Sequence, residues 1–359
     1  MALAMGIGRF AYTALLPSLK AGLGFDAAAG GAIASANLIG YLIGVLWARH
    51  TPHGRPRTWL IQSGLLLSVA STAAVAAVSG FPAWAGLRFV GGVASGLVFV
   101  LVSATVLEGL PSGAEPLAGI LYAGVGIGIA LSGATSAALS ASPWQHAWIF
   151  LAALSAVLAV PAFFLSPAGG TKPVQPLATT SGSLTLRRLG VVYFLEGLGY
   201  IVSGTFAVAA VQQMPGLSAW APWVWVAAGV AAAPSAIFWS RIARRVGSRK
   251  ALVFAYAAQA AGMAVPALSH SAAAAVVGAL LFGGTFVGIV TVLLDLARRL
   301  DPTSASRTIG SLTAVYGIGQ AAGPLLAGWL TRAAGSPAPA VLSASAAVAL
   351  GAMLLAAAE

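Results

Sequence analysis

The feature that most constrains this chain is a succession of twelve apolar segments, each long enough to cross a lipid bilayer. A membrane-spanning helix needs about 20 mostly apolar residues. The segments are continuous rather than alternating, which predicts helices and not barrel strands. Charged residues make up only 7% of the sequence, against roughly 25% in soluble domains. We therefore expect an all-α polytopic membrane protein.

The expected spans are separated by short breaks that contain glycine, proline or charged residues. They cover residues 1–19, 29–48, 59–79, 83–107, 116–140, 147–166, 189–211, 220–240, 250–268, 272–296, 308–330 and 338–357. A segment rich in proline, glycine and serine follows the sixth span and has no helical pattern. The expected division is an N-terminal six-helix bundle at 1–166, a cytoplasmic linker at 167–188 and a C-terminal six-helix bundle at 189–359.

The basic residues set the expected orientation. One set of alternate loops holds 14 of the 18 Lys and Arg residues, whereas the opposite loops hold only Lys20 and Arg332. Basic residues accumulate on the cytoplasmic side of membrane proteins, so both termini are expected in the cytoplasm. This placement also explains the net charge of +11 without a nucleic-acid partner.

The two halves of the sequence resemble each other, because short motifs recur in the same order with a nearly constant offset. The pairs are Gly6-Ile-Gly8 with Gly197-Leu-Gly199 (offset 191), Trp47-Ala-Arg49 with Trp239-Ser-Arg241 (192), Gly91-Gly92 with Gly283-Gly284 (192), and Gly124, Gly128 and Gly133 with Gly319, Gly323 and Gly328 (195). A six-plus-six duplication predicts a substrate site between the halves near the middle of the bilayer, with alternating access by rocking of the halves.

This organisation resembles the major facilitator superfamily (MFS) over the whole chain. The second cytoplasmic loop of each half, WARHTPHGRPR at 47–57 and WSRIARRVGSRK at 239–250, is similar to the loop signature of that superfamily, although the first copy lacks the usual acidic residue. The opening GIGRFAYTALLPSL, with ANLIGYLIG at 36–44, is similar to its uncharacterised YbfB/YjiJ-like branch. The resemblance implies a monomeric secondary transporter of a bacterial inner membrane, whose first, fourth, seventh and tenth spans line a central cavity.

Arg9 lies in the middle of the first span. Its guanidinium stays protonated at any accessible pH, and placing it at mid-bilayer costs at least ~2.5–3.5 kcal/mol. An ionisable residue at this depth is a functional-site candidate by default, and a guanidinium binds a carboxylate in a bidentate pair. Arg9 is therefore predicted to anchor an anionic group of a substrate. The alternative is a structural partner for Glu196 or for carbonyls at a helix end.

Glu196 is the candidate proton carrier on the seventh span, where it shares a helix face with Tyr200. A nearby guanidinium favours the charged form of a carboxyl. An anion that arrives at Arg9 is thus expected to change the proton affinity of Glu196, which gives a physical basis for coupling. The alternative is a permanent Arg9–Glu196 ion pair.

Further polar residues within the spans are candidate substrate contacts. They are Tyr12, Asn37, Arg88, Tyr122, Tyr200, Tyr316 and Gln320. For Arg88, near the outer end of the fourth span, one interpretation is that it guides anions inward and the other is that it snorkels to the lipid headgroups. For the neutral residues, the alternative is a hydrogen bond between helices, which is the more common case.

Charged residues near the cytoplasmic span ends are candidate gates. Glu108 and Asp295 lie near the ends of the fourth and tenth spans, close to basic loops that carry Arg49 in the first half and Arg241 and Arg245 in the second. Ion pairs there would hold the inner side shut and would break when it opens. The alternative is that both acidic residues are solvated end charges.

The predicted function is secondary, proton-coupled transport of a small organic anion, with a carboxylate as the expected group. The alternative within the same fold is a proton-driven exporter of drugs or metabolites. An enzyme, a cofactor and a metal site are not expected, because cysteine is absent, the four histidines lie near the membrane surfaces, and the acidic residues do not cluster. A channel is disfavoured by the lack of a charged ring or a filter-like segment.

Overall fold

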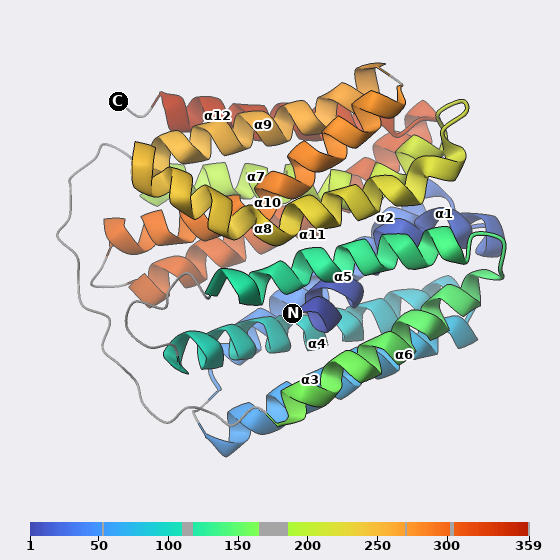
Figure 1. The fold of residues 1–359 in the computed structure, drawn as a ribbon, viewed down its shortest axis with the longest axis horizontal. Coiled ribbons are helices and arrows are strands. Elements are labelled where there is room, and N and C mark those ends of the chain that lie inside the picture. Colours follow the sequence, from blue (N-terminus) through green and yellow to red (C-terminus); the bar gives the residue numbers. More distant parts are fainter. Residues whose placement is uncertain (52–53, 110–117, 165–185, 270, 302–304, 358–359) are drawn as a thin grey trace.

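The computed structural model describes residues 1–51, 54–109, 118–164, 186–269, 271–301 and 305–357. In these residues the chain forms twelve long α-helices that run roughly along one direction (Figure 1). The helices are α1 (Ala11–Leu23), α2 (Ala27–Ala48), α3 (Arg55–Ala74), α4 (Phe81–Gly109), α5 (Ala118–Ala138), α6 (Trp144–Phe163), α7 (Leu186–Gln212), α8 (Ala221–Val246), α9 (Ser248–Ser269), α10 (Ala272–Leu300), α11 (Ala305–Ala334) and α12 (Ala338–Ala356). A π-helical segment, Ala2–Ile7, precedes α1.

The expected all-α class is confirmed. Eleven helical segments within the described ranges are long and apolar enough to cross a membrane. The twelfth, α11, is 30 residues long, but glycine and hydroxyl-bearing residues lower its apolarity. This helix also carries the buried side chains of Tyr316 and Gln320. It packs between α2 and α7, so these two polar side chains face protein rather than lipid.

The first six helices and the last six pack in corresponding pairs. In the first half, α4 packs on α2 and α3, and α3 packs on α6; in the second half, α10 packs on α8 and α9, and α9 packs on α12. The main contacts between the halves are those of α2 with α11 and of α5 with α8. These contacts are therefore arranged with an approximate twofold relationship.

Close glycine contacts repeat at one offset. A Cβ on Gly6 would meet the carbonyl of Val125 on α5, and a Cβ on Gly197 would meet the carbonyl of Tyr316 on α11. Both differences, 197 − 6 and 316 − 125, equal 191. The offset of 195 expected for the glycine motifs of α5 and α11 is thus wrong by four residues, which is about one helical turn. Glycines that recur along one face of a helix match almost as well after a shift of one turn.

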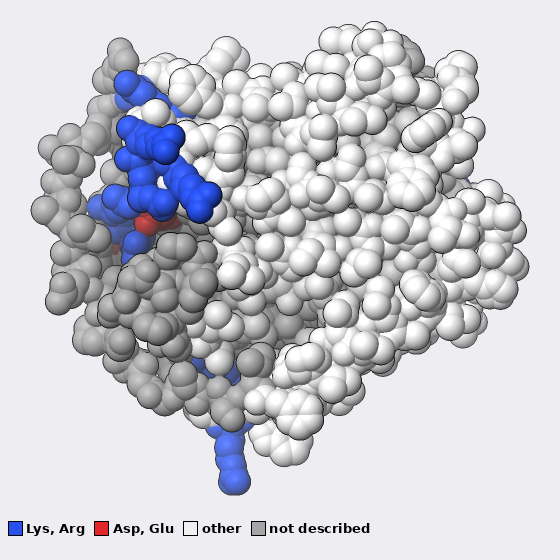
Figure 2. Space-filling view, viewed as in Figure 1, with Lys and Arg blue, Asp and Glu red and all other residues white. Residues whose placement is uncertain are grey.

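The Lys and Arg side chains that are visible in Figure 2 gather at one end of the bundle, and the rest of the described surface in that view carries neither basic nor acidic side chains. At this end Arg249, at the start of α9, donates to the carbonyls of Leu355 (2.8 Å) and Ala356 in the last turn of α12. Exposed apolar side chains such as Phe254 and Trp329 lie along the sides of the helices. The distribution of charge fits a bundle whose sides face lipid.

Two adjacent glycines of α10 provide a matched test of the packing. A Cβ on Gly283 would collide with the carbonyl of Ala228 on α8, whereas a Cβ on Gly284 would have the Ala231 Cβ, at 3.9 Å, as its nearest neighbour. Overpacking costs about 1–3 kcal/mol. We expect Gly283→Ala to lower the melting temperature of the purified protein by about 2–5 °C. We expect Gly284→Ala to be neutral or slightly stabilising, because alanine is the better helix former. Equal melting temperatures for the two variants would contradict the packing of α8 on α10.

Candidate functional site

The first span is interrupted near Arg9. The π-helical segment Ala2–Ile7 is followed by a turn at residues 8–10, and α1 begins only at Ala11. The amide of Gly8 bonds to the carbonyl of Leu3 (2.7 Å), and the amide of Thr13 bonds to the carbonyl of Phe10 (3.2 Å). Single π-turns and broken helices within membranes occur often at functional sites. The interruption places Arg9 where the two halves meet.

The guanidinium of Arg9 is buried and contacts the second half. Its Nη2 donates to the Tyr200 hydroxyl (2.9 Å) and to Oε1 of Gln320 (2.6 Å). Nε2 of Gln320 also donates to the Tyr200 hydroxyl (3.2 Å). Cζ of Arg9 lies 4.5 Å from the centre of the Tyr41 ring, within the range of a cation–π interaction. The structure therefore brings together Arg9, Tyr200 and Gln320 from the first span, α7 and α11.

No acidic side chain in the described part of the chain forms an ion pair with Arg9. Ion pairs do form toward the two ends of the bundle, where Asp295 pairs with Arg298 and Arg299, and Asp26 pairs with Arg332. The charge of Arg9 is instead held by neutral oxygens and an aromatic ring. The Arg9–Glu196 ion pair, one of the expected alternatives, is not formed in this structure.

Glu196 lies one helical turn from Tyr200 on α7, and it is completely buried. Its Oε1 accepts a hydrogen bond from Nε2 of Gln259 on α9 (2.8 Å), and Oε1 of Gln259 accepts one from the Thr285 hydroxyl on α10 (3.1 Å). Oε2 of Glu196 has no hydrogen-bond partner among the described residues. Glu196 therefore belongs to a polar group inside the second half, and Gln259 is a member that sequence reasoning missed. A lone glutamine within the ninth span was the available signal.

Tyr316 and Tyr200 belong to a stack of aromatic rings between Arg9 and the interior of the second half. The ring of Tyr316 stacks on Tyr193, with centroids 4.2 Å apart, and on Tyr200, with centroids 5.7 Å apart. The Tyr200 ring stacks in turn on Phe286 of α10, also at 5.7 Å. Stacked rings of this kind contribute about 0.5–1.5 kcal/mol beyond their buried area. The stack fixes the Tyr200 hydroxyl against Arg9.

Two other expected contacts lie away from the guanidinium of Arg9. The Tyr12 hydroxyl donates to the carbonyl of Gly30 on α2 (2.9 Å), which is a hydrogen bond between helices. The partly buried Tyr122 ring on α5 packs near Phe99, with centroids 6.1 Å apart. The structure does not bring these two side chains to the group formed by Arg9, Tyr200 and Gln320.

Arg88 does not snorkel, because its side chain is buried within the first half and only 4% of the residue is exposed. Its Nη1 donates to the carbonyl of Gly8 (2.7 Å) and its Nη2 to the carbonyl of Arg9 (2.9 Å). The backbone carbonyl of Arg88 accepts a hydrogen bond from Nδ2 of Asn37 (2.7 Å). The Arg88 side chain thus lies against the backbone of Arg9, and the Asn37 side chain lies against the backbone of Arg88.

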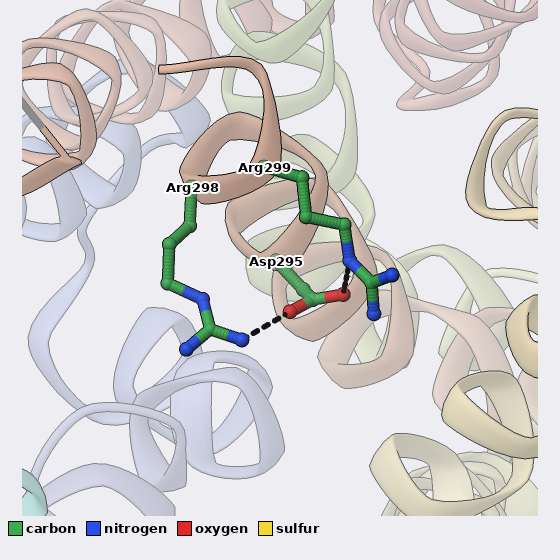
Figure 3. Close-up of polar contacts among 3 residues, drawn as sticks. All are labelled: Asp295, Arg298 and Arg299. Carbon is green, nitrogen blue, oxygen red and sulfur yellow. Dashed lines mark hydrogen bonds and ion pairs between the residues drawn. The ribbon is translucent and has the colours of Figure 1, made fainter. Parts of the chain in front are cut away.

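The candidate gate residue Asp295 pairs within its own helix. It contacts Arg298 at 2.9 Å and Arg299 at 2.8 Å, three and four residues along α10 (Figure 3). Side chains at this spacing are neighbours on a helix surface. The expected pairing with Arg241 and Arg245 is not formed among the described contacts of Asp295.

The other candidate gates belong to the first half. Glu108 is in the last turn of α4, and its side chain lies outside the described residues. The guanidinium of Arg49 lies against Gly310 on α11, where a Cβ would come within 2.6 Å of Nη2. Arg49 therefore lies against the backbone of the second half at the basic end of the bundle.

A cavity of about 170 Å³ lies inside the second half, between the ends of α7, α9 and α10 that are remote from the basic end. Its lining is mainly apolar and includes Met214, Trp225, Met263 and Phe282. Arg9 is not among the lining residues, so this cavity is separate from the polar group at the centre.

The comparisons with known proteins agree with this architecture. Residues 1–356 match the family model of the uncharacterised MFS-type transporter YbfB. The chain belongs to this family. The resemblance expected from the sequence is thereby confirmed for almost the whole of this MFS-type transporter. None of the curated proteins matches it.

Solved structures of transporters share the fold of this MFS-type transporter. A point mutant of the nucleoside transporter NupG superposes with a TM-score of 0.78 at 14% identity, covering 99% of this chain and 97% of that one. The human organic anion transporter MFSD10 gives 0.67 at 20% identity, with coverages of 99% and 97%. A bacterial homologue of the human lysosomal transporter Spinster, in an inward-facing and unoccupied conformation, gives 0.67 at 15%, with 99% and 94%. At these identities the likeness establishes the fold alone.

Proposed function

We propose that this MFS-type transporter moves a small organic anion across the bacterial cytoplasmic membrane by alternating access, and that it recognises a carboxylate group. The observation that carries the proposal is the guanidinium of Arg9, which is buried and has only neutral acceptors among the described residues. A buried charge without a counter-charge is costly. A carboxylate supplies that counter-charge and matches the two-pronged geometry of a guanidinium.

The hydrogen bonds of Arg9 link anion binding to movement of the two halves. Arg9 belongs to the first half, and its acceptors Tyr200 and Gln320 belong to the second. A charge-assisted bond to a carboxylate is about twice as strong as one to a neutral oxygen. An arriving anion would therefore displace a neutral acceptor from the guanidinium. That exchange would loosen a contact between the halves, which is what a rocking movement requires.

We propose that transport is coupled to protons through Glu196. Its carboxyl is fully buried and bonded to the neutral Gln259, and none of the basic residues within the described ranges pairs with it. A carboxyl in such a place is less costly when neutral. It lies one turn from Tyr200, which contacts Arg9. Exchange of partners at Arg9 would thus alter the surroundings of the proton site through a shared helix.

The orientation follows from charge. Because the basic residues gather at one end of the bundle (Figure 2), we place that end in the cytoplasm. The C-terminal end of α12 would then face the cytoplasm, and the first span, which begins near the middle of the bundle, would run toward the outer side (Figure 1). The protein would act as a monomer with a duplicated core. The competing function is export of drugs or metabolites, for which Arg9 would be a structural residue.

A thermal-shift screen tests the anion site. Detergent-purified protein would be heated with monocarboxylates, dicarboxylates, amino acids, sulfonates and lipophilic cations. A ligand present at 100 times its Kd stabilises the folded state by about 2.7 kcal/mol, so a positive shift with carboxylates is expected. Arg9→Ala should abolish that shift, and Arg9→Lys, which keeps the charge but loses the paired donors, should reduce it.

Arg332→Ala is the matched control for this screen. Arg332 is an exposed cation at the opposite end from the basic cluster and is 3.5 Å from Asp26, so its removal should leave the carboxylate response intact. Stabilisation by lipophilic cations, or an equal carboxylate response in Arg9→Ala, would contradict the anion site and favour the exporter.

The coupling is tested in proteoliposomes with Glu196→Gln, which keeps the shape of the side chain but cannot exchange a proton. We expect the variant to exchange the best anion from the screen across the membrane without a gradient, because Arg9 is intact. We expect it to lose accumulation driven by a pH gradient. Uphill accumulation at the wild-type level in Glu196→Gln would rule out this residue as the proton carrier.

A further inference from the structure

The carbonyls of Gly8 and Arg9 are where the first span departs from helical hydrogen bonding. In a continuous α-helix these carbonyls accept from the amides of residues 12 and 13. Here the amide of Thr13 bonds to the Phe10 carbonyl instead (3.2 Å). Backbone groups freed inside a membrane must find other partners, because each unsatisfied group costs several kcal/mol in an apolar medium.

The guanidinium of Arg88 supplies those partners from α4. It donates through Nη1 to the Gly8 carbonyl (2.7 Å) and through Nη2 to the Arg9 carbonyl (2.9 Å). Of the two long basic side chains, only arginine presents its donors in a rigid charged fork, and two successive carbonyls match that fork. Basic side chains also bind the last carbonyls of helical segments, which is the position that Gly8 and Arg9 hold after Ala2–Ile7.

Arg88 is itself held in place. Its guanidinium carbon lies 5.3 Å from the centre of the Tyr12 ring and 5.9 Å from that of the Trp148 ring. Its backbone carbonyl accepts from Nδ2 of Asn37 on α2 (2.7 Å). The donor fork is therefore fixed by residues of the first half alone.

From this geometry we infer that Arg88 is a positioning residue that fixes the backbone of Arg9 to the first half, and that it is not a ligand of the substrate. The two ends of Arg9 are then held by different halves. Its carbonyl is bound by Arg88, and its guanidinium by Tyr200 and Gln320. When an anion displaces the second-half partners, Arg9 stays with the first half. This functional consequence rests on the proposed anion site at Arg9, but the anchoring itself does not.

Hydrogen–deuterium exchange tests the anchoring without any substrate. The amides of residues 8–14 would be compared in the full-length wild-type protein, Arg88→Gln, Arg88→Lys and Arg9→Ala. Loss of the charged fork should speed their exchange by about tenfold in Arg88→Gln, because hydrogen bonds to charged groups are among the stronger ones. Arg88→Lys, which retains a cation but not the fork, should give an intermediate rate.

The pattern across variants separates positioning from general stability. Arg9→Ala keeps the Arg9 carbonyl, so residues 8–14 should stay as protected as in the wild type, although the carboxylate response is lost. Arg332→Gln, the charge-matched control, should leave these amides unchanged. In Arg88→Lys, the amides in helices of the second half, such as α9, should exchange at the wild-type rate, because the effect of the substitution is expected to be local.

Two results would overturn the inference. The first is unchanged exchange of residues 8–14 in Arg88→Gln or, if that variant does not fold, in Arg88→Lys. The second is faster exchange spread evenly over the whole chain, which would make Arg88 a general stabilising residue. If the exchange pattern is as expected while no carboxylate binds in the thermal-shift screen, the anchoring stands and the proposed anion site fails.

Discussion

The structure is organised around a charge that cannot be neutralised. The guanidinium of Arg9 keeps its proton at any accessible pH, and here it lies buried where the two halves meet. The protein surrounds it with a hydroxyl from Tyr200, an amide oxygen from Gln320 and the face of Tyr41. These groups orient the charge but do not cancel it. The contact between the halves at the centre is consequently the one for which the proposed anion would compete.

The duplication explains why this contact lies at the centre. Arg9 bonds to Tyr200, and the Thr13 hydroxyl donates to the Gly204 carbonyl. Both pairs are separated by 191 residues, which is the offset between the repeats. Residues at equivalent positions can touch only where the axis that relates the halves passes between them. A strictly symmetric site would set two guanidinium groups against each other, and like charges at this distance repel. The second copy instead carries Tyr200, which accepts from the first.

Glu196, unlike Arg9, is hydrogen-bonded within one half of the molecule. Its partners Gln259 and Thr285 lie on helices of the second half, so its environment is set within one half rather than between the two. Rocking of the halves would leave its hydrogen bonds in place while it changes the contacts of Tyr200 one turn away. Separate positions for the proposed anion and proton sites, linked by α7, would permit each to affect the other without direct contact.

Much of this arrangement could be predicted from the sequence, because it depends on long patterns. The number of helices, the basic end and the burial of Arg9 follow from apolar runs and the placement of charge. Contacts that depend on a local irregularity could not be predicted. The break after Ala2–Ile7 exposes two carbonyls, and only those carbonyls explain why Arg88 turns inward rather than to the headgroups. Likewise, Asp295 pairs with basic residues of its own helix rather than with those expected from the loop.

The most direct measurement of the central claim is a thermodynamic cycle between ligand charge and Arg9. Isothermal titration would compare the carboxylate that stabilises the protein most with its neutral carboxamide, on the wild type and on Arg9→Leu. A charged hydrogen bond that is lost costs about 1.5–3 kcal/mol, so the wild type should bind the carboxylate at least tenfold more tightly than the amide. In Arg9→Leu that preference should disappear. An equal preference for the carboxylate in both proteins would contradict the account, because the charge of the ligand would then be recognised elsewhere.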